Sequence, residues 1–353
     1  MWGRLFSRQP PFQAALRCKI AVVLKTLFLL TAATLSAQKT LDIYWIDAEG
    51  GAATLIVTPS GQSLLADTGN PGNRDSQRIF DVATKQAHLK KIDQVLITHF
   101  HSDHVGGVPA LAKLIPIGEY IDHGDSVETQ NPADNQRWEA YKTISAGHRT
   151  SLKVGEQIKM KGMKLEIVSS NGEVLSKGGS ANPLCSSAQK KEVDPTENAR
   201  SLGFKLTYNK FTFLDLGDLT WNKELELSCP ENHLGHVTLY QATHHGFYND
   251  NSGAPAHVWS LQPQVVIVNN GPKKGLGANA WDTLSKIPTL EDTWQVHLSL
   301  ATDQAHNTAS QQIANMEPTA ECKGNFLKAS ISPDGKFTIT SSRNNFSKSY
   351  TVR

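Results

Sequence analysis

The feature that most constrains this chain is a run of metal-ligand side chains directly after a short apolar segment. Residues 94–98 form a β-branched run suited to a buried strand, and His99, His101, Asp103 and His104 follow within six positions. Side chains alternate along extended backbone, so His99 and His101 point to the same side and can share one cation. The turn after them allows Asp103 and His104 to face a second cation. The segment therefore predicts a metal site at the end of a buried strand.

Strand and helix signals alternate on both sides of this segment. Strands are predicted where apolar residues alternate or cluster between turn residues, at 41–47, 54–58, 63–67, 163–168, 201–208, 211–216, 237–243, 265–269 and 336–340. Helical spacing predicts helices at 75–91, 108–114 and 138–146, and the Gly-, Ser- and Lys-rich stretch 171–198 is expected to be a long surface loop. Two strand-rich halves with helices predict an α/β fold, with two sheets covered on both outer faces.

The N-terminal segment differs in charge from the rest of the chain. Residues 1–37 contain five basic and no acidic side chains, and their apolar run, broken by Lys25, ends in small residues. This pattern is typical of a secretory signal, so we expect 1–37 to be removed and 38–353 to form one secreted or periplasmic domain without stable membrane association. The alternative is a membrane anchor, although the run after Lys25 is short for a span of about 20 residues.

The charge and cysteines of the expected mature chain limit its partners. It would have 30 basic and 33 acidic residues, a net charge of −3 with histidine neutral. Nucleic-acid binding usually needs a basic stripe, so a small-molecule substrate is expected and nucleic acid is not. Cys185, Cys229 and Cys322 allow one disulfide in an oxidising compartment and leave one thiol over. Because no two are close in sequence, a cysteine-based metal site is not expected.

Three further motifs follow in an order that carries a family resemblance. The His-x-His-x-Asp-His pattern resembles that of the metallo-β-lactamase-fold hydrolases, a superfamily with a four-layer αβ/βα sandwich of two mixed sheets and usually two metal ions. Asp67 in Leu-Leu-Ala-Asp-Thr-Gly looks like the aspartate that supports the metal loop in that family. Asp218 in Leu-Asp-Leu-Gly-Asp looks like its metal-bridging aspartate. His244 and His245, followed by glycine, look like its last histidine motif.

The resemblance narrows to one branch of that superfamily. The segment Asn198-Ala-Arg-Ser201, with the Asp218 and His244 motifs, resembles the hydrolase domain of ComEC-type DNA-uptake proteins and the phosphorylcholine esterases. The usual third-motif histidine has no clear counterpart, and His123 and His148 are its candidates. The third protein ligand of the His99/His101 site therefore stays open, and solvent can take that position.

The charges of these groups indicate a mechanism. Two divalent cations bridged by Asp218 would lower the pKa of a shared water toward neutrality and polarise the bond that the hydroxide attacks. Zinc is favoured because most ligands are imidazoles, and iron or manganese are compatible with the carboxylates. We expect His245 to bind the metal of Asp103 and His104. We expect His244 to donate to the transition state or the leaving group, so Asp103, Asp218 and His244 are the expected catalytic residues.

These residues favour an exported binuclear hydrolase whose metal-bridged hydroxide attacks a small ester, phosphodiester or lactone. The alternatives are a ComEC-like extracellular nuclease and a metal-binding module without turnover on the same fold.

Other polar residues allow two interpretations each. Asp47 belongs either to an Asp-rich turn of the ComEC-like pattern or to an ordinary solvated turn. Asn270 follows a strand and either touches substrate or forms a turn. His297 and His306 come late in the chain, where they could reach the site or serve structure alone.

Overall fold

The strands of this protein assemble into two large mixed sheets, which the computed structural model describes over residues 40–319 and 322–353. The expected signal segment, 1–37, lies outside the described residues, so its cleavage and the domain boundary at residue 38 stay predictions. Among the described residues, no helix is both long and apolar enough to cross a membrane.

The first sheet has an antiparallel half and a parallel half, in the order β20-β19-β18-β1-β2-β3-β4-β5-β6. Antiparallel pairing runs from β20 to β3, and β3 to β6 are parallel. Its strands are β1 (Leu41–Trp45), β2 (Thr54–Val57), β3 (Ser63–Ala66), β4 (Ile92–Leu96), β5 (Ile117–Asp122), β6 (Arg149–Ser151), β18 (Leu327–Ile331), β19 (Lys336–Ser341) and β20 (Ser347–Thr351).

The second sheet repeats this division, in the order β17-β16-β15-β14-β12-β11-β8-β7, with β9 beside β8. Here neighbouring strands from β12 through β14, β15 and β16 to β17 pair in parallel. Neighbouring strands from β12 through β11 and β8 to β7 pair antiparallel. Its strands are β7 (Gln157–Met160), β8 (Met163–Ser170), β9 (Glu173–Val174), β11 (Gly203–Tyr208), β12 (Phe211–Asp215), β14 (Leu239–Gln241), β15 (Val265–Val268), β16 (Asp292–His297) and β17 (Ile313–Asn315). A small separate ladder joins β10 (Ser180–Ala181) to β13 (Glu231–Asn232).

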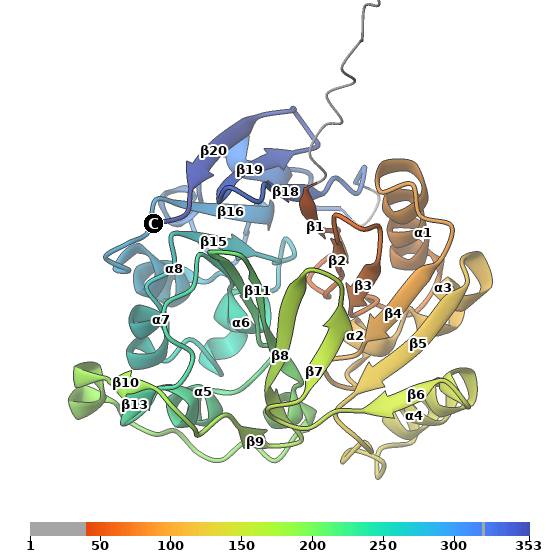
Figure 1. Ribbon diagram of the computed structural model, residues 1–353, viewed down its shortest axis with the longest axis horizontal. Coiled ribbons are helices and arrows are strands. Elements are labelled where there is room, and N and C mark those ends of the chain that lie inside the picture. Colours follow the sequence, from red (N-terminus) through yellow and green to blue (C-terminus); the bar gives the residue numbers. More distant parts are fainter. Residues whose placement is uncertain (1–39, 320–321) are drawn as a thin grey trace, which may run out of the picture. The chain divides into compact units, whose positions relative to one another are not determined.

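The helices cover the two outer faces of the sheets (Figure 1). The first sheet carries α1 (Asn73–Asp81), α2 (Ser102–Val105), α3 (Val108–Leu114) and α4 (Pro132–Ser145); the second carries α5 (Trp221–Ser228), α6 (Thr243–Phe247), α7 (Pro255–Leu261) and α8 (Ala278–Ser285). One apolar cluster fills the space between the sheets, and one lies under the helices on each side. Three apolar interfaces separate four layers, so the predicted αβ/βα sandwich is confirmed.

Several predicted boundaries need correction. The helix predicted at 75–91 begins at Asn73 and ends as a π-helical turn at Val82–Gln86, because His88 has a left-handed backbone. The helix predicted at 138–146 begins six residues earlier, where the side chain of Asn131 accepts a hydrogen bond from the backbone N–H of Ala133. The strand predicted at 237–243 is only β14.

The stretch 171–198 is less uniform than a surface loop. It contains β9, β10 and the 3₁₀ helix Pro183–Ser187, and a further 3₁₀ turn begins at Glu197. Glu197 is 1% exposed. A disulfide joins Cys185 to Cys229, whose Cα atoms are 5.6 Å apart, and leaves Cys322 as the free cysteine of the described residues. Part of this stretch is therefore anchored in the protein interior.

Candidate metal centre

The topology brings four chain segments to one edge of the sandwich. Asp67 directly follows β3, and the metal-ligand loop at 99–104 follows β4, its parallel neighbour. Asp218 follows β12, and His244 and His245 follow β14, again its parallel neighbour. The carboxyl ends of parallel strands meet at one edge, so side chains from both sheets converge there.

Four donor atoms form a compact group at this edge. They are Asp103 Oδ2, His104 Nε2, Asp218 Oδ2 and His245 Nε2. His104 and His245 each lie 3.2–3.3 Å from both carboxylate oxygens and 3.3 Å from each other. A tetrahedron with such edges has its centre about 2.0 Å from each corner, which equals the usual length of Zn–N and Zn–O bonds. The residues present therefore fit a divalent cation.

A second set of imidazoles lies next to this group. His99 Nε2 is 3.1 Å from His101 Nδ1 and 3.9 Å from Asp218 Oδ2. His244 Nε2 is 3.3 Å from the same oxygen of Asp218. One oxygen of Asp218, Oδ2, is therefore near imidazoles of both sets. We call these seven residues, namely His99, His101, Asp103, His104, Asp218, His244 and His245, the metal centre.

Neither candidate for the missing third-motif histidine joins this group. His148 is exposed on the surface. His123 is buried, and its Nε2 lies 3.0 Å from Glu197 Oε2. His244 is a further imidazole that the structure places against Asp218, so its side chain is available either as a ligand or as a proton donor.

Asp67 fixes the orientation of His104. Its Oδ2 lies 2.6 Å from His104 Nδ1, and its two oxygens accept hydrogen bonds from the N–H and the hydroxyl of Thr98 at 2.8 Å. The Nδ1 atom then carries the proton, and the lone pair of Nε2 points to the other donors. A Cβ at Gly107 would collide with the backbone oxygen of Thr68, so glycine allows the metal loop to pass close to β3.

Two glutamates that sequence reasoning missed support the metal loop. Glu128 Oε2 lies 2.9 Å from His101 Nε2, which leaves Nδ1 of His101 facing His99. Glu197 accepts a hydrogen bond from the backbone N–H of Phe100. Neither glutamate lies in a recognisable motif, because each comes from an irregular segment away from the metal loop in sequence.

Burial and neighbouring charges set the protonation of the centre. Burial opposes ionisation of Asp218, yet His104, His245 and His244 hold its pKa well below the usual range. Burial lowers the pKa of His99 well below its ordinary value, and His104 adds to the effect. Burial likewise lowers the pKa of His244 to about 4. His99 and His244 are therefore neutral imidazoles with free lone pairs. For His104, burial is outweighed by Asp218 and Asp67, which raise its pKa well above the ordinary value, so a bound cation would displace a proton there.

The backbone of the last histidine motif is strained. His244, His245 and Phe247 have φ values of 53°, 58° and 60°, in the left-handed region that side chains rarely adopt. Hydrogen bonds over-determine this turn, since the N–H of His244 donates to the carbonyl of Gly217 at 3.0 Å. The strain aims both imidazoles at Asp218.

The centre opens to solvent on one side. The side chains of His101 and Glu128 are 28% and 25% exposed, whereas those of His99 and His104 are fully buried. Lys274, another residue missed in the sequence, pairs with Asp103 at this opening and is 27% exposed. A cavity of about 430 Å³ lies beside it, lined by residues that include Phe247, Tyr248, Asp250, Lys273 and Gly275.

The remaining candidates lie apart from this centre. Asn270 is fully buried and donates to the carbonyl of His297 at 2.9 Å, so its role is structural. His306 pairs with Asp303 near the surface. Asp47 is not solvated, because it is fully buried and pairs with His297 at 2.6 Å.

The comparisons with known proteins agree with this description. Residues 46–182 match the metallo-beta-lactamase superfamily. A UPF0173 metal-dependent hydrolase of Cupriavidus necator is 38% identical over 73 residues, which are 21% of this chain and 23% of that protein. An atrochrysone carboxyl ACP thioesterase of Aspergillus fumigatus is 38% identical over 66 residues, 19% of this chain and 20% of that protein.

These relatives match only in part. The chain spans about a quarter or less of the length of the two curated relatives named above. Among solved structures, the metallo-beta-lactamase fold protein YhfI from Bacillus subtilis is similar with a TM-score of 0.46 and 11% identity, over 72% of this chain and 95% of that one.

Proposed function

We propose that this protein is an exported metal-dependent hydrolase with a binuclear centre that cleaves a small ester, phosphodiester or lactone. The position of Asp218 carries the proposal: one carboxylate oxygen lies 3.2–3.9 Å from four imidazoles that belong to two sets. Zinc is the favoured metal because imidazoles supply five of the seven side chains of the metal centre.

Each side chain at the opening has a distinct task in this proposal. Divalent cations, when bound, supply an activated water and polarise the bond to be cleaved. His244 is neutral at working pH, and its ring N–H donates a proton to the leaving group. Lys274 lies beside Asp103 at the solvent side and supplies a positive charge for a substrate oxygen that becomes negative. The buried walls around His99 and His104 exclude bulk water.

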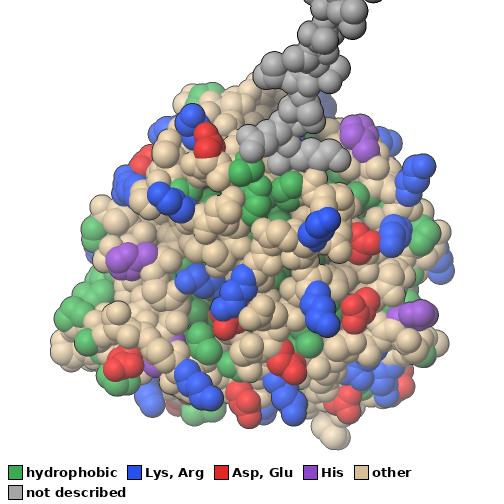
Figure 2. Space-filling model, viewed as in Figure 1, with side chains coloured by type: hydrophobic (Ala, Val, Ile, Leu, Met, Phe, Trp, Pro, Cys, Tyr) green, Lys and Arg blue, Asp and Glu red, His purple; other side chains and the backbone are tan. Residues whose placement is uncertain are grey.

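Two observations bear on the substrate class. The relatives named above include metal-dependent hydrolases and a thioesterase, which supports carbonyl ester or thioester cleavage. On the face shown in Figure 2, Lys and Arg side chains are scattered among Asp and Glu side chains and form no band. A chain with this surface and an expected mature charge of −3 has little attraction for nucleic acid, so we do not favour the nuclease.

The disulfide supports export. Such bonds persist in oxidising compartments, and the Cys185–Cys229 pair forms in this structure. Mass-spectrometric reading of the exported chain tests the cleavage after residue 37. A chain that begins at Met1 and remains in membranes would contradict it.

A substrate screen tests the proposed activity. The zinc-loaded protein is offered nitrophenyl esters, a thioester, bis-nitrophenyl phosphate, a lactone and a chromogenic cephalosporin. Asp218→Ala is the inactive control, and Asp303→Ala is the matched control because it removes the carboxylate of an exposed Asp–His pair. Hydrolysis by the wild type and Asp303→Ala, but not by Asp218→Ala, supports the proposal. Metal-loaded protein without turnover on every class would favour the non-catalytic alternative.

A further inference from the structure

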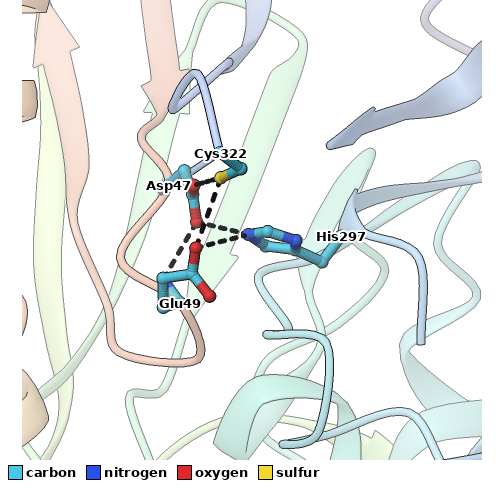
Figure 3. A group of neighbouring side chains, drawn as sticks. All are labelled: Asp47, Glu49, His297 and Cys322. Atoms are coloured by element: carbon cyan, nitrogen blue, oxygen red, sulfur yellow. Dashed lines mark hydrogen bonds and ion pairs between the residues drawn. The ribbon is translucent and has the colours of Figure 1, made fainter. Parts of the chain in front are cut away.

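A second group of donor side chains lies at the same edge of the sandwich, outside the metal centre. Asp47, Glu49, His297 and Cys322 each offer one donor atom, and these atoms lie within 4.8 Å of one another (Figure 3). We call these four residues the Cys322 cluster. Asp47 and Glu49 come from the loop after β1, His297 ends β16, and Cys322 precedes β18. Three segments from both sheets therefore meet at one point.

The separations in the cluster suit one small cation. Cys322 Sγ lies 3.1 Å from Asp47 Oδ2 and 3.3 Å from Glu49 Oε1. His297 Nε2 lies 2.6 Å from Asp47 Oδ1 and 3.8 Å from Glu49 Oε1. Ligand atoms around tetrahedral zinc are about 3.3–3.6 Å apart, given bond lengths of about 2.0–2.3 Å. The measured distances bracket that range, so shifts of less than about 1 Å close the four side chains on a cation.

The carboxylates of the cluster are buried, so an uncompensated negative charge on them costs free energy. The side chains of Asp47 and Glu49 are 0% and 9% exposed, and the guanidinium of Arg78 lies 2.7 Å and 3.8 Å from them. Arg74, one turn earlier on α1, pairs with its neighbour in sequence. Two carboxylates facing one guanidinium carry excess negative charge in the interior. A divalent cation bound together with the thiolate of Cys322 brings the whole group to neutrality.

We propose that the Cys322 cluster is a structural zinc site, separate from the metal centre. Thiolate, imidazole and carboxylate are the ligands that zinc prefers, and four protein ligands close its coordination shell. On binding, the thiol proton of Cys322 passes to solvent, and the proton of the neutral His297 ring moves from Nε2 to Nδ1, which frees the Nε2 lone pair for the cation. The site holds its cation without an open position for substrate.

The position of the cluster explains what a bound cation would stabilise. Residues 47–52 connect it to the metal centre, since the N–H of Ala52 donates to the carbonyl of Asp103 at 3.0 Å. Asn70 supports the same loop through a 2.8 Å hydrogen bond to the carbonyl of Ala48. A cation bound to Asp47 and His297 would clamp β1 to β16 and steady the loop under Asp103.

Cobalt substitution tests the proposal through the thiolate. The full chain carries Cys18→Ser, so that Cys322 is the one cysteine outside the disulfide. The Co²⁺-loaded protein is expected to show a thiolate-to-metal charge-transfer band, which Cys322→Ser abolishes. His245→Ala, which affects the metal centre alone, keeps the band. Elemental analysis of the zinc forms is expected to find one zinc fewer in Cys322→Ser than in its parent.

Thiol protection keeps the test decisive if Cys322→Ser fails to fold. Added zinc is expected to slow alkylation of Cys322 in the parent chain at least tenfold, and a chelator to restore it. A parent chain without the charge-transfer band and without this protection would overturn the proposal, leaving Arg78 as the cation of the cluster. The zinc difference between parent and Cys322→Ser does not depend on the metal centre, so this test stands apart from that of the hydrolase.

Discussion

Two groups of histidine and carboxylate lie at the same edge of this protein, yet they differ in composition and in access. The metal centre has five imidazoles, four of them near Asp218, and is partly exposed to solvent at His101 and Lys274. The Cys322 cluster has one imidazole, one thiol and two carboxylates, with Arg78 pressed against it. Catalytic zinc sites keep an open position, whereas structural sites are closed by four protein ligands. The difference in access matches the two proposed roles, which are turnover at the metal centre and stability at the Cys322 cluster.

The largest expected effect comes from removing the shared carboxylate of the metal centre. Asp218→Ala leaves several imidazoles and a cation without their common anion, so metal and activity should be lost together. We expect kcat/KM to fall by at least about 10³-fold. Elemental analysis and turnover on the substrate found by the screen measure both. Retention of metal and of full turnover would remove the reason to treat Asp218 as a bridge.

The two adjacent histidines should fail in different ways. His245 lies 3.2 Å from Asp103 and belongs to the tetrahedral group, so His245→Ala should lose a metal ion. His244→Ala should keep metal content near that of the wild type and lower kcat by about 10²-fold, as expected for loss of one proton donor. Parallel metal analysis and kcat of the two variants decide the assignment. If His244→Ala loses a metal ion instead, this histidine is the missing third ligand of the His99/His101 site.

The orientation of His104 gives a smaller effect. Asp67→Asn keeps the size of the side chain but weakens the 2.6 Å contact with His104 Nδ1. Removing such a partner typically weakens metal binding 10- to 100-fold. Competition with a chromogenic chelator measures the affinity. The matched control is Asp93→Asn, a carboxylate that bonds to Ser63 far from any imidazole, and it should bind metal as the wild type does.

The smallest effect concerns a histidine that faces no carboxylate. His257 is fully buried, Ser228 Oγ lies 2.7 Å from its Nδ1, and burial lowers its pKa to about 3. In the unfolded chain this histidine takes up a proton near pH 6.5, whereas in the folded chain it stays neutral down to about pH 3. The free energy of unfolding therefore falls as the pH drops from about 6.5 toward 3. Relative to His257→Gln, the wild type should lose about 1 kcal/mol per pH unit below pH 6.

Urea unfolding of wild type and variant between pH 5 and 7 measures that difference. Comparison with the variant is needed because Glu224, whose pKa burial raises to about 8, contributes the opposite slope: its stabilisation is full below about pH 4.5 and is lost as pH rises through 8. Parallel pH profiles of wild type and His257→Gln would show that burial does not keep this histidine neutral.

The elements that could be predicted from the sequence are those whose own residues carry a clear strand, turn or ligand pattern. The strand β1 alternates visibly, turn residues mark β2 and β3 as a hairpin, and the metal loop follows an apolar run, so all of these were predictable. The strand β16 and the helix α8 were not predicted, because their signals are weak without the sheet that they pack on. Tertiary contacts decide such elements.

The same distinction applies to the site residues. The residues of the His-x-His-x-Asp-His motif are adjacent in sequence, whereas Lys274 and Glu128 reach the centre only through folding. Cys322 lies 275 positions from Asp47, so spacing along the chain gave no reason to pair a thiol with that turn. The expectation that the cysteines serve no metal site came from their spacing in the sequence alone. Folding brings side chains together that are far apart in the sequence.

Reconstitution tests the central claim most directly. The protein is stripped of metal with a chelator and titrated with zinc, while hydrolysis of the substrate found by the screen is followed. The metal centre predicts that the stripped protein is inactive and that activity rises with bound zinc and is absent throughout the titration in Asp218→Ala. Equal turnover by the stripped and the zinc-loaded protein would contradict it.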